Sequence, residues 1–167
     1  MNMNKEIILN AIKKGITGEL DSITLYQKAY ENSTEEVKTF FENRVQEEKR
    51  HYNYLLSFYQ DISDNKELSD LSAELAKDHA ISPIVSEEFS KRIAQNQILF
   101  SSISTALLLE KNAIDFYQKT AEETEIDALK NFYLELVKWE KQHYDDLLQI
   151  QQESEVLFWE INQFQPF

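Results

Sequence analysis

The amino-acid sequence predicts an all-α protein that folds as a single four-helix bundle. Only two glycines and two prolines occur among 167 residues, so few positions force a helix to break. Four long segments carry apolar residues at alternating spacings of three and four, which is the period of a helix with one buried face. A chain of this length can bury a substantial core within one domain, which we expect to span residues 1–167.

The first two helices are expected at about residues 5–32 and 34–59, where they form an antiparallel hairpin. The turn between them contains Ser33 and, three residues later, Glu36, a spacing typical of a capping box at a helix N-terminus. The inward positions are Ile12, Ile16, Glu19, Ile23, Tyr26 and Tyr30 in the first helix, and Val37, Phe41, Val45, Glu48, Tyr52, Leu55 and Tyr59 in the second.

A second hairpin is expected from helices at about residues 96–123 and 125–152, with Thr124 as the cap of the later helix. Residues 153–167 form a C-terminal extension that is rich in aromatic residues, which suggests docking onto the bundle or a subunit interface. The inward positions are Leu99, Ile103, Ala106, Glu110, Ala113 and Tyr117, followed by Leu129, Tyr133, Leu136, Glu140, His143, Leu147 and Ile150.

The segment between the hairpins, residues 61–95, is polar and contains Pro83 and His79. A connection of this length can run along the whole bundle, with short helical turns expected near 68–77 and 84–94. This predicts a bundle with one long crossover rather than an up-and-down bundle with short loops. We expect His79 to be solvated.

In each of the four predicted helices, the row of inward-facing apolar residues is interrupted near its middle by a glutamate. These glutamates are Glu19, Glu48, Glu110 and Glu140. Two of the three histidines follow two of these glutamates at one spacing, as Glu48-x-x-His51 and Glu140-x-x-His143. Two residues are level across an antiparallel hairpin when their midpoint falls on the turn, and this holds for the glutamate pair of each hairpin. The two halves also read as a repeat, because "ELDSITLYQKA" and "EKNAIDFYQKT" each begin at one of these glutamates.

These four glutamates and two histidines, in this pattern, indicate a metal site. Four buried carboxylates without partners would be costly or would take up protons, whereas two divalent ions would neutralise them. One Glu from each of two helices and Glu-x-x-His from the other two is the arrangement of di-iron and di-manganese carboxylate sites, and structural zinc prefers a closed four-ligand shell. A single Glu-x-x-His is a common coincidence on a Glu-rich helix, but two aligned copies are not. Tyr26 and Tyr117 are expected to be core tyrosines whose hydroxyls hydrogen-bond ligand carboxylates.

The whole chain resembles the rubrerythrin and ferritin-like di-iron family, with these motifs in the same order. The resemblance is carried by Gly18-Glu19, by Tyr26 seven residues later, and by "EEKRH" ending at His51. Two features depart from the rubrerythrin pattern. Ala113 stands where rubrerythrins carry a second glutamate one turn after the third-helix ligand, and the chain has no cysteine for a rubredoxin domain.

The resemblance implies a ferritin-like bundle with two iron ions per chain, with manganese or zinc as alternative metals. Glu48 and Glu140 would bridge the two ions, and each ion would be completed by one histidine and one further glutamate. The implied ligands are Glu19, Glu48, His51, Glu110, Glu140 and His143.

The function implied by the resemblance is that of a di-iron oxidoreductase, which reduces hydrogen peroxide or dioxygen with electrons from a separate donor such as a rubredoxin-like protein. Iron storage at a ferroxidase centre is a second hypothesis, because the six-ligand pattern permits it. However, a connection of about 35 residues is unlike that of a standard cage subunit. A non-catalytic metal-binding bundle is the third hypothesis.

Charge and composition exclude several other classes of partner. The net charge of −13 argues against binding to nucleic acid or to an anionic membrane, since both require basic patches. The absence of cysteine excludes disulfides and thiolate metal sites. No signal peptide or membrane span is visible in the sequence, so a cytoplasmic protein is expected, and a symmetric homodimer is the expected assembly.

Overall fold

The computed structural model describes residues 3–77 and 82–163, and within these ranges it contains six α-helices and no strand. The four long helices are α1 (Met3–Glu31), α2 (Glu35–Ser63), α5 (Gln97–Glu123) and α6 (Asp127–Ile161). Two short helices, α3 (Ser72–Leu75) and α4 (Glu87–Gln95), lie in the connection between the hairpins. Among the described residues, no helix is both long and apolar enough to cross a bilayer. The predicted all-α fold is confirmed.

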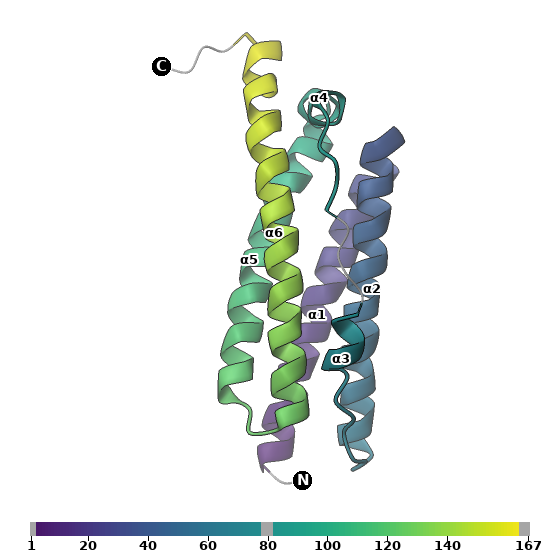
Figure 1. Cartoon of the computed structure of the whole chain (residues 1–167), viewed down its shortest axis with the longest axis vertical. Coiled ribbons are helices and arrows are strands. Elements are labelled where there is room, and N and C mark those ends of the chain that lie inside the picture. The colour runs from purple at the N-terminus through teal and green to yellow at the C-terminus, as the bar shows by residue number, and fades with distance from the viewer. Residues whose placement is uncertain (1–2, 78–81, 164–167) are drawn as a thin grey trace.

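The four long helices pack as two antiparallel hairpins, α1–α2 and α5–α6, joined by a connection that runs from one end of the bundle to the other (Figure 1). At one end, Lys5 Nζ donates a hydrogen bond to the carbonyl of Ser63 (2.9 Å), so α2 ends beside the start of α1. At the other end, the Asn96 side chain donates to the carbonyl of Asn32 (3.2 Å), so α5 begins beside the α1–α2 turn. The long crossover expected from the sequence is therefore present.

The two short helices fasten this connection to the bundle. In α3, Leu75 is fully buried, and its carbonyl accepts a hydrogen bond from Trp139 Nε1 on α6 (3.3 Å). In α4, Ser86 caps the N-terminus by accepting from the Phe89 amide (3.0 Å), and the Phe89 ring is buried in the core. His79 lies outside the described residues, so the expectation that it is solvated stays a prediction.

The turn between α1 and α2 differs from the expected capping box. Thr34, not Ser33, occupies the N-cap position of α2, and no side chain bonds there to the helix amides. The Ser33 hydroxyl instead donates to the carbonyl of Tyr30 (2.9 Å). The predicted capping box of Ser33 with Glu36 is therefore wrong, because the serine hydroxyl donates to the Tyr30 carbonyl at the end of α1, which also accepts from the Ser33 amide.

The turn between α5 and α6 also differs from the expectation. Helix α6 begins at Asp127, with Ile126 as its N-cap residue, so Thr124 is not the cap of this helix. The Thr124 hydroxyl accepts a hydrogen bond from the Ile126 amide (3.3 Å) and so stabilises the turn that precedes α6.

Helix α6 continues nine residues beyond the expected end at 152, so residues 153–161 of the predicted extension are helical. No glycine or proline interrupts this part of the sequence, and Ser154 is small enough to be fully buried where the apolar stripe is broken. Phe158 stacks on Phe100 of α5, with ring centroids 4.6 Å apart, which docks this part of the chain onto the bundle. Residues 164–167 lie outside the described part.

The core that the described residues form consists of two hydrophobic clusters. One contains Phe41, Phe89 and Leu99 and lies toward the α1–α2 turn. The other contains Ile12 and Phe132 and lies toward the α5–α6 turn. The middle turns of the four long helices contribute buried charged side chains instead, and these form the candidate site.

Candidate metal centre

Six ionisable side chains from all four long helices meet in the middle of the bundle. Each is at most 3% exposed, which is rare for charged groups that have no compensating partner. The spacing i, i+3 puts the glutamate and histidine of each motif on one helix face. The structure thus brings together the six residues that the sequence pointed to, which are Glu19 (α1), Glu48 and His51 (α2), Glu110 (α5), and Glu140 and His143 (α6).

The six side chains form two overlapping groups of four. Within each group, one candidate ligand atom from every residue lies within 4.8 Å of the others. Glu48 and Glu140 belong to both groups. The first group is completed by Glu19 and His51, and the second by Glu110 and His143.

The ring nitrogens face the carboxylates closely, but not as hydrogen-bond partners. His143 Nδ1 lies 3.0 Å from Glu48 Oε1, and His51 Nδ1 lies 3.2 Å from Glu140 Oε1. All four of these atoms are buried, and none of them has a hydrogen bond of acceptable geometry within the described part of the chain. Nitrogen and oxygen atoms that converge in this way, without hydrogen-bonding one another, are suited to binding a metal ion between them. The residues present therefore fit a pair of metal ions.

The electrostatics of the cluster separate the glutamates into two kinds. Burial and the negative charges of Glu140 and Glu48 raise the pKa of Glu19 well above its ordinary value, and burial together with Glu140 does the same for Glu110. Burial would also raise the pKa values of Glu48 and Glu140, but the facing histidines outweigh it. They hold the pKa of Glu48 well below its ordinary value and lower the pKa of Glu140 to about 2. The two glutamates shared by both groups therefore favour the ionised form, whereas burial favours the protonated form of the other two.

Two tyrosines support the outer glutamates in a crossed arrangement. Tyr26 on α1 donates a hydrogen bond from its hydroxyl to Glu110 on α5, and Tyr117 on α5 donates to Glu19 on α1. Both tyrosines are 1% exposed. Each hairpin thus orients a carboxylate of the other hairpin, which links the two halves of the bundle across the site.

A buried ion network beside His143 was missed by the sequence analysis. Arg44 Nη1 lies 2.7 Å from Glu47 Oε2, and Arg44 Nη2 lies 2.5 Å from Asp146 Oδ2. The same Glu47 oxygen lies 3.2 Å from His143 Nε2, the ring nitrogen that faces away from the four glutamates. Burial would raise the pKa of Glu47, but His143 and Arg44 hold it below its ordinary value. The available signal was Arg44 three residues before Glu47 and seven before His51, on one face of α2.

A cavity of about 210 Å³ between α1 and α5 reaches the cluster, and its lining includes Glu19, Glu48 and Glu140. Gly18 and Ala113 also line it. A Cβ added at Gly18 would meet no atom within 4 Å, so this glycine borders open space. The cavity gives small molecules a path to the carboxylates.

The family described as Rubrerythrin matches residues 10–151, a range that contains all six clustered residues and both tyrosines. Neither a curated protein nor a solved structure matches the chain.

Proposed function

Because the chain belongs to the rubrerythrin family, we propose that it is a di-iron oxidoreductase that reduces hydrogen peroxide, or dioxygen, with electrons from a separate donor. The observation that carries this proposal is the pair of overlapping ligand groups that share Glu48 and Glu140. Two shared carboxylates between two histidine-containing groups match a bridged pair of ions and not two independent sites.

In this proposal each residue has a distinct role. Glu48 and Glu140 would contribute to both ions, since they belong to both groups and their pKa values are lowered. Glu19 and His51 would complete the set around one ion, and Glu110 and His143 the set around the other. When bound, the iron pair supplies the two electrons that, with two protons, reduce one hydrogen peroxide to two waters.

The surrounding residues favour a small oxidant. The cavity beside Gly18 holds only about 210 Å³, and Ala113 adds no carboxylate to the site from its position one turn after Glu110. The chain has no cysteine, so the electrons that restore the reduced site come from a group outside these 167 residues. A rubredoxin-like protein is the kind of donor that we propose.

The proposal is tested by loading the metal-free protein with ferrous iron under anaerobic conditions and then adding hydrogen peroxide or dioxygen. We expect one rapid oxidation by peroxide that stops until a reductant is added, slower oxidation by dioxygen, and retention of about two irons per chain. Absorbance follows the oxidation, and metal analysis after gel filtration gives the retained iron. Glu48→Ala, which lacks a shared carboxylate, is the matched control and should show no rapid phase.

Two results would contradict the proposal. Continued uptake of ferrous iron to tens of ions per chain in a large assembly would show iron storage. Stable binding of two ions with no reaction toward either oxidant would show a non-catalytic metal-binding bundle.

A further inference from the structure

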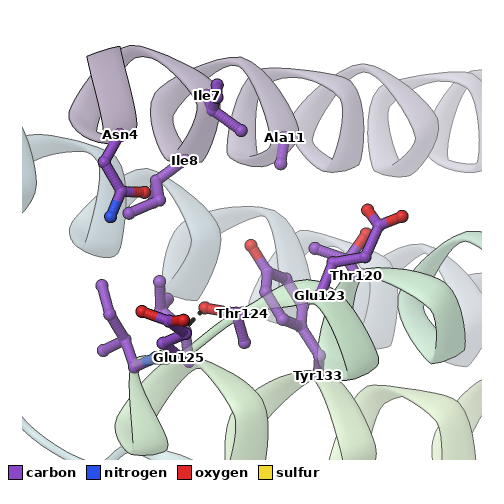
Figure 2. Close-up of a pocket in the computed structure, with 11 residues that line it drawn as sticks. Asn4, Ile7, Ile8, Ala11, Thr120, Glu123, Thr124, Glu125 and Tyr133 are labelled. Carbon is purple, nitrogen blue, oxygen red and sulfur yellow. Dashed lines mark hydrogen bonds between the residues drawn. The ribbon is translucent and has the colours of Figure 1, made fainter.

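A second cavity, of about 300 Å³, lies away from the metal centre, between the first turns of α1 and the turn that joins α5 to α6 (Figure 2). Its apolar walls come from α1, with Ile8 and Ala11, and from the start of α6, with Leu129. None of the six clustered glutamates and histidines lines it. A mostly apolar hollow of this size, with a few polar groups, has the character of a small-molecule site.

One polar group in this cavity is buried without a partner. Tyr133 is 1% exposed, and its hydroxyl has no hydrogen-bond partner among the described residues. Figure 2 shows the side chain reaching from α6 toward α1, so the hydroxyl points into the cavity. Burial raises the pKa of Tyr133 above its ordinary value, so the hydroxyl stays neutral and can donate a hydrogen bond. A buried hydroxyl in an apolar wall calls for a partner.

The tyrosine ring is held in place from the side. It stacks on Tyr117, with ring centroids 5.9 Å apart and an angle of 18° between the planes, and it contacts Phe132 at 6.2 Å. Tyr117 is itself fixed by its hydrogen bond to Glu19. The hydroxyl of Tyr133 therefore has a defined position, which is what orients a ligand in a site.

The charged residues of the lining restrict the class of ligand. Glu123 and Glu125 line the cavity, and no lysine or arginine of the described part of the chain does. An anion would be repelled by these carboxylates, and any ion would lose hydration against the apolar walls. We propose that this cavity binds a small uncharged molecule with an apolar body, about the size of one ring, and one oxygen that bonds to the hydroxyl of Tyr133.

The proposal is tested with three fluorinated probes that share one ring, in ¹⁹F NMR titrations of the whole chain. 4-Fluorobenzyl alcohol has the apolar body and the oxygen, 4-fluorotoluene lacks the oxygen, and 4-fluorobenzoate carries a negative charge. We expect saturable binding of the alcohol, weaker binding of the toluene and no binding of the benzoate. Tyr133→Phe should weaken the binding of the alcohol about three- to tenfold, because one hydrogen bond is lost. The affinity for the toluene should stay within about twofold of that of the unaltered protein.

Three further variants give the controls. Ala11→Leu fills the cavity and should abolish binding of both uncharged probes, and Tyr144→Phe, on α6 but outside the cavity, should leave binding unchanged. Glu48→Ala should also bind the alcohol normally, so this result is independent of the metal chemistry. The proposal is overturned if no probe saturates, as when only water bonds Tyr133. It is equally overturned if Tyr133→Phe weakens both uncharged probes alike or if Ala11→Leu binds as the unaltered chain does.

Discussion

His51 and His143 occupy equivalent positions in the two hairpins, but different groups stand behind them. Nε2 of His143 lies 3.2 Å from the carboxylate of Glu47, which is held by the buried Arg44, although no hydrogen bond of acceptable geometry joins the two within the described part of the chain. Nε2 of His51 has no hydrogen-bond partner within the described part of the chain, and the ring meets Trp139 edge to face, with centroids 5.3 Å apart. Trp139 also meets the His143 ring edge to face, with centroids 5.9 Å apart. Both histidines thus contact this aromatic ring, and His143 in addition faces the carboxylate of Glu47.

The internal repeat explains where the difference arises. A shift of 92 residues, which relates His51 to His143, also relates Glu47 to Trp139 and Arg44 to Leu136. The ligand positions are the same in both halves, whereas the residues that support them are charged in one half and apolar in the other. A carboxylate behind a metal-binding histidine orients the ring and increases its basicity. We therefore expect the ion held by His143 to bind more tightly than the ion held by His51.

The largest expected effect separates the shared glutamates from those that serve one half. Glu48→Ala and Glu140→Ala should each lose both metal ions, because each carboxylate belongs to both ligand groups. Glu19→Ala should lose mainly the ion on the His51 side, and Glu110→Ala the ion on the other side. Metal analysis of the four purified variants measures this. Retention of two ions by both Glu48→Ala and Glu140→Ala would rule out bridging.

The next effect concerns how much the buried network of Arg44, Glu47 and Asp146 contributes to the stability of the protein. Arg44→Met leaves Glu47 and Asp146 buried without their cation and should lower the free energy of unfolding by about 3–5 kcal/mol. The equivalent change in the other half, Leu136→Met, conserves volume and should cost less than about 1.5 kcal/mol. Urea unfolding of the metal-free proteins measures both.

A triple variant checks the cause of this loss. Arg44→Met combined with Glu47→Gln and Asp146→Asn removes the uncompensated charges, so it should recover part of the stability. No recovery would mean that the packing of the arginine side chain, and not its charge, is what the network contributes.

A smaller effect tests the asymmetry itself. Glu47→Gln should weaken binding of one of the two ions about ten- to hundredfold, because His143 loses the carboxylate behind it. Trp139→Phe, at the equivalent position of the other half, keeps an aromatic ring beside both histidines and should alter either affinity far less. Competition titrations with a chelator and Co²⁺ resolve two affinities. If the two affinities are equal in the unaltered protein and Glu47→Gln does not change them, then Glu47 does not affect metal affinity.

The smallest effect should be the same in both halves. Tyr26→Phe and Tyr117→Phe each remove one hydrogen bond to a buried glutamate, so each should cost about 1–3 kcal/mol in the free energy of unfolding. Equal losses are expected because the two bonds are crossed copies of one another. Thermal unfolding of the two variants measures the difference. A much larger loss in one of them would show that the asymmetry extends beyond the histidines.

The sequence by itself determined the helices and the meeting of the six ionisable residues. Helical period is a local property, and the spacing Glu-x-x-His puts both side chains on one face wherever the helix lies. The positions of the two turns predicted that Glu19 lies opposite Glu48, and Glu110 opposite Glu140, across each hairpin. The predicted caps at Ser33 and Thr124 were wrong, but the glutamates of each hairpin still lie opposite one another. A helix end can shift by a residue or two without moving the middle of a hairpin.

Only the tertiary structure decided how the two hairpins support each other. The bonds from Tyr26 to Glu110 and from Arg44 to Asp146 join residues 84 and 102 positions apart. Their pairing depends on how one hairpin packs against the other, and no turn or period in the sequence specifies that. For the same reason the burial of Arg44 was not predicted. A charged residue on a polar helix is expected to be exposed, and its burial depends on Asp146, a partner that is distant in the sequence.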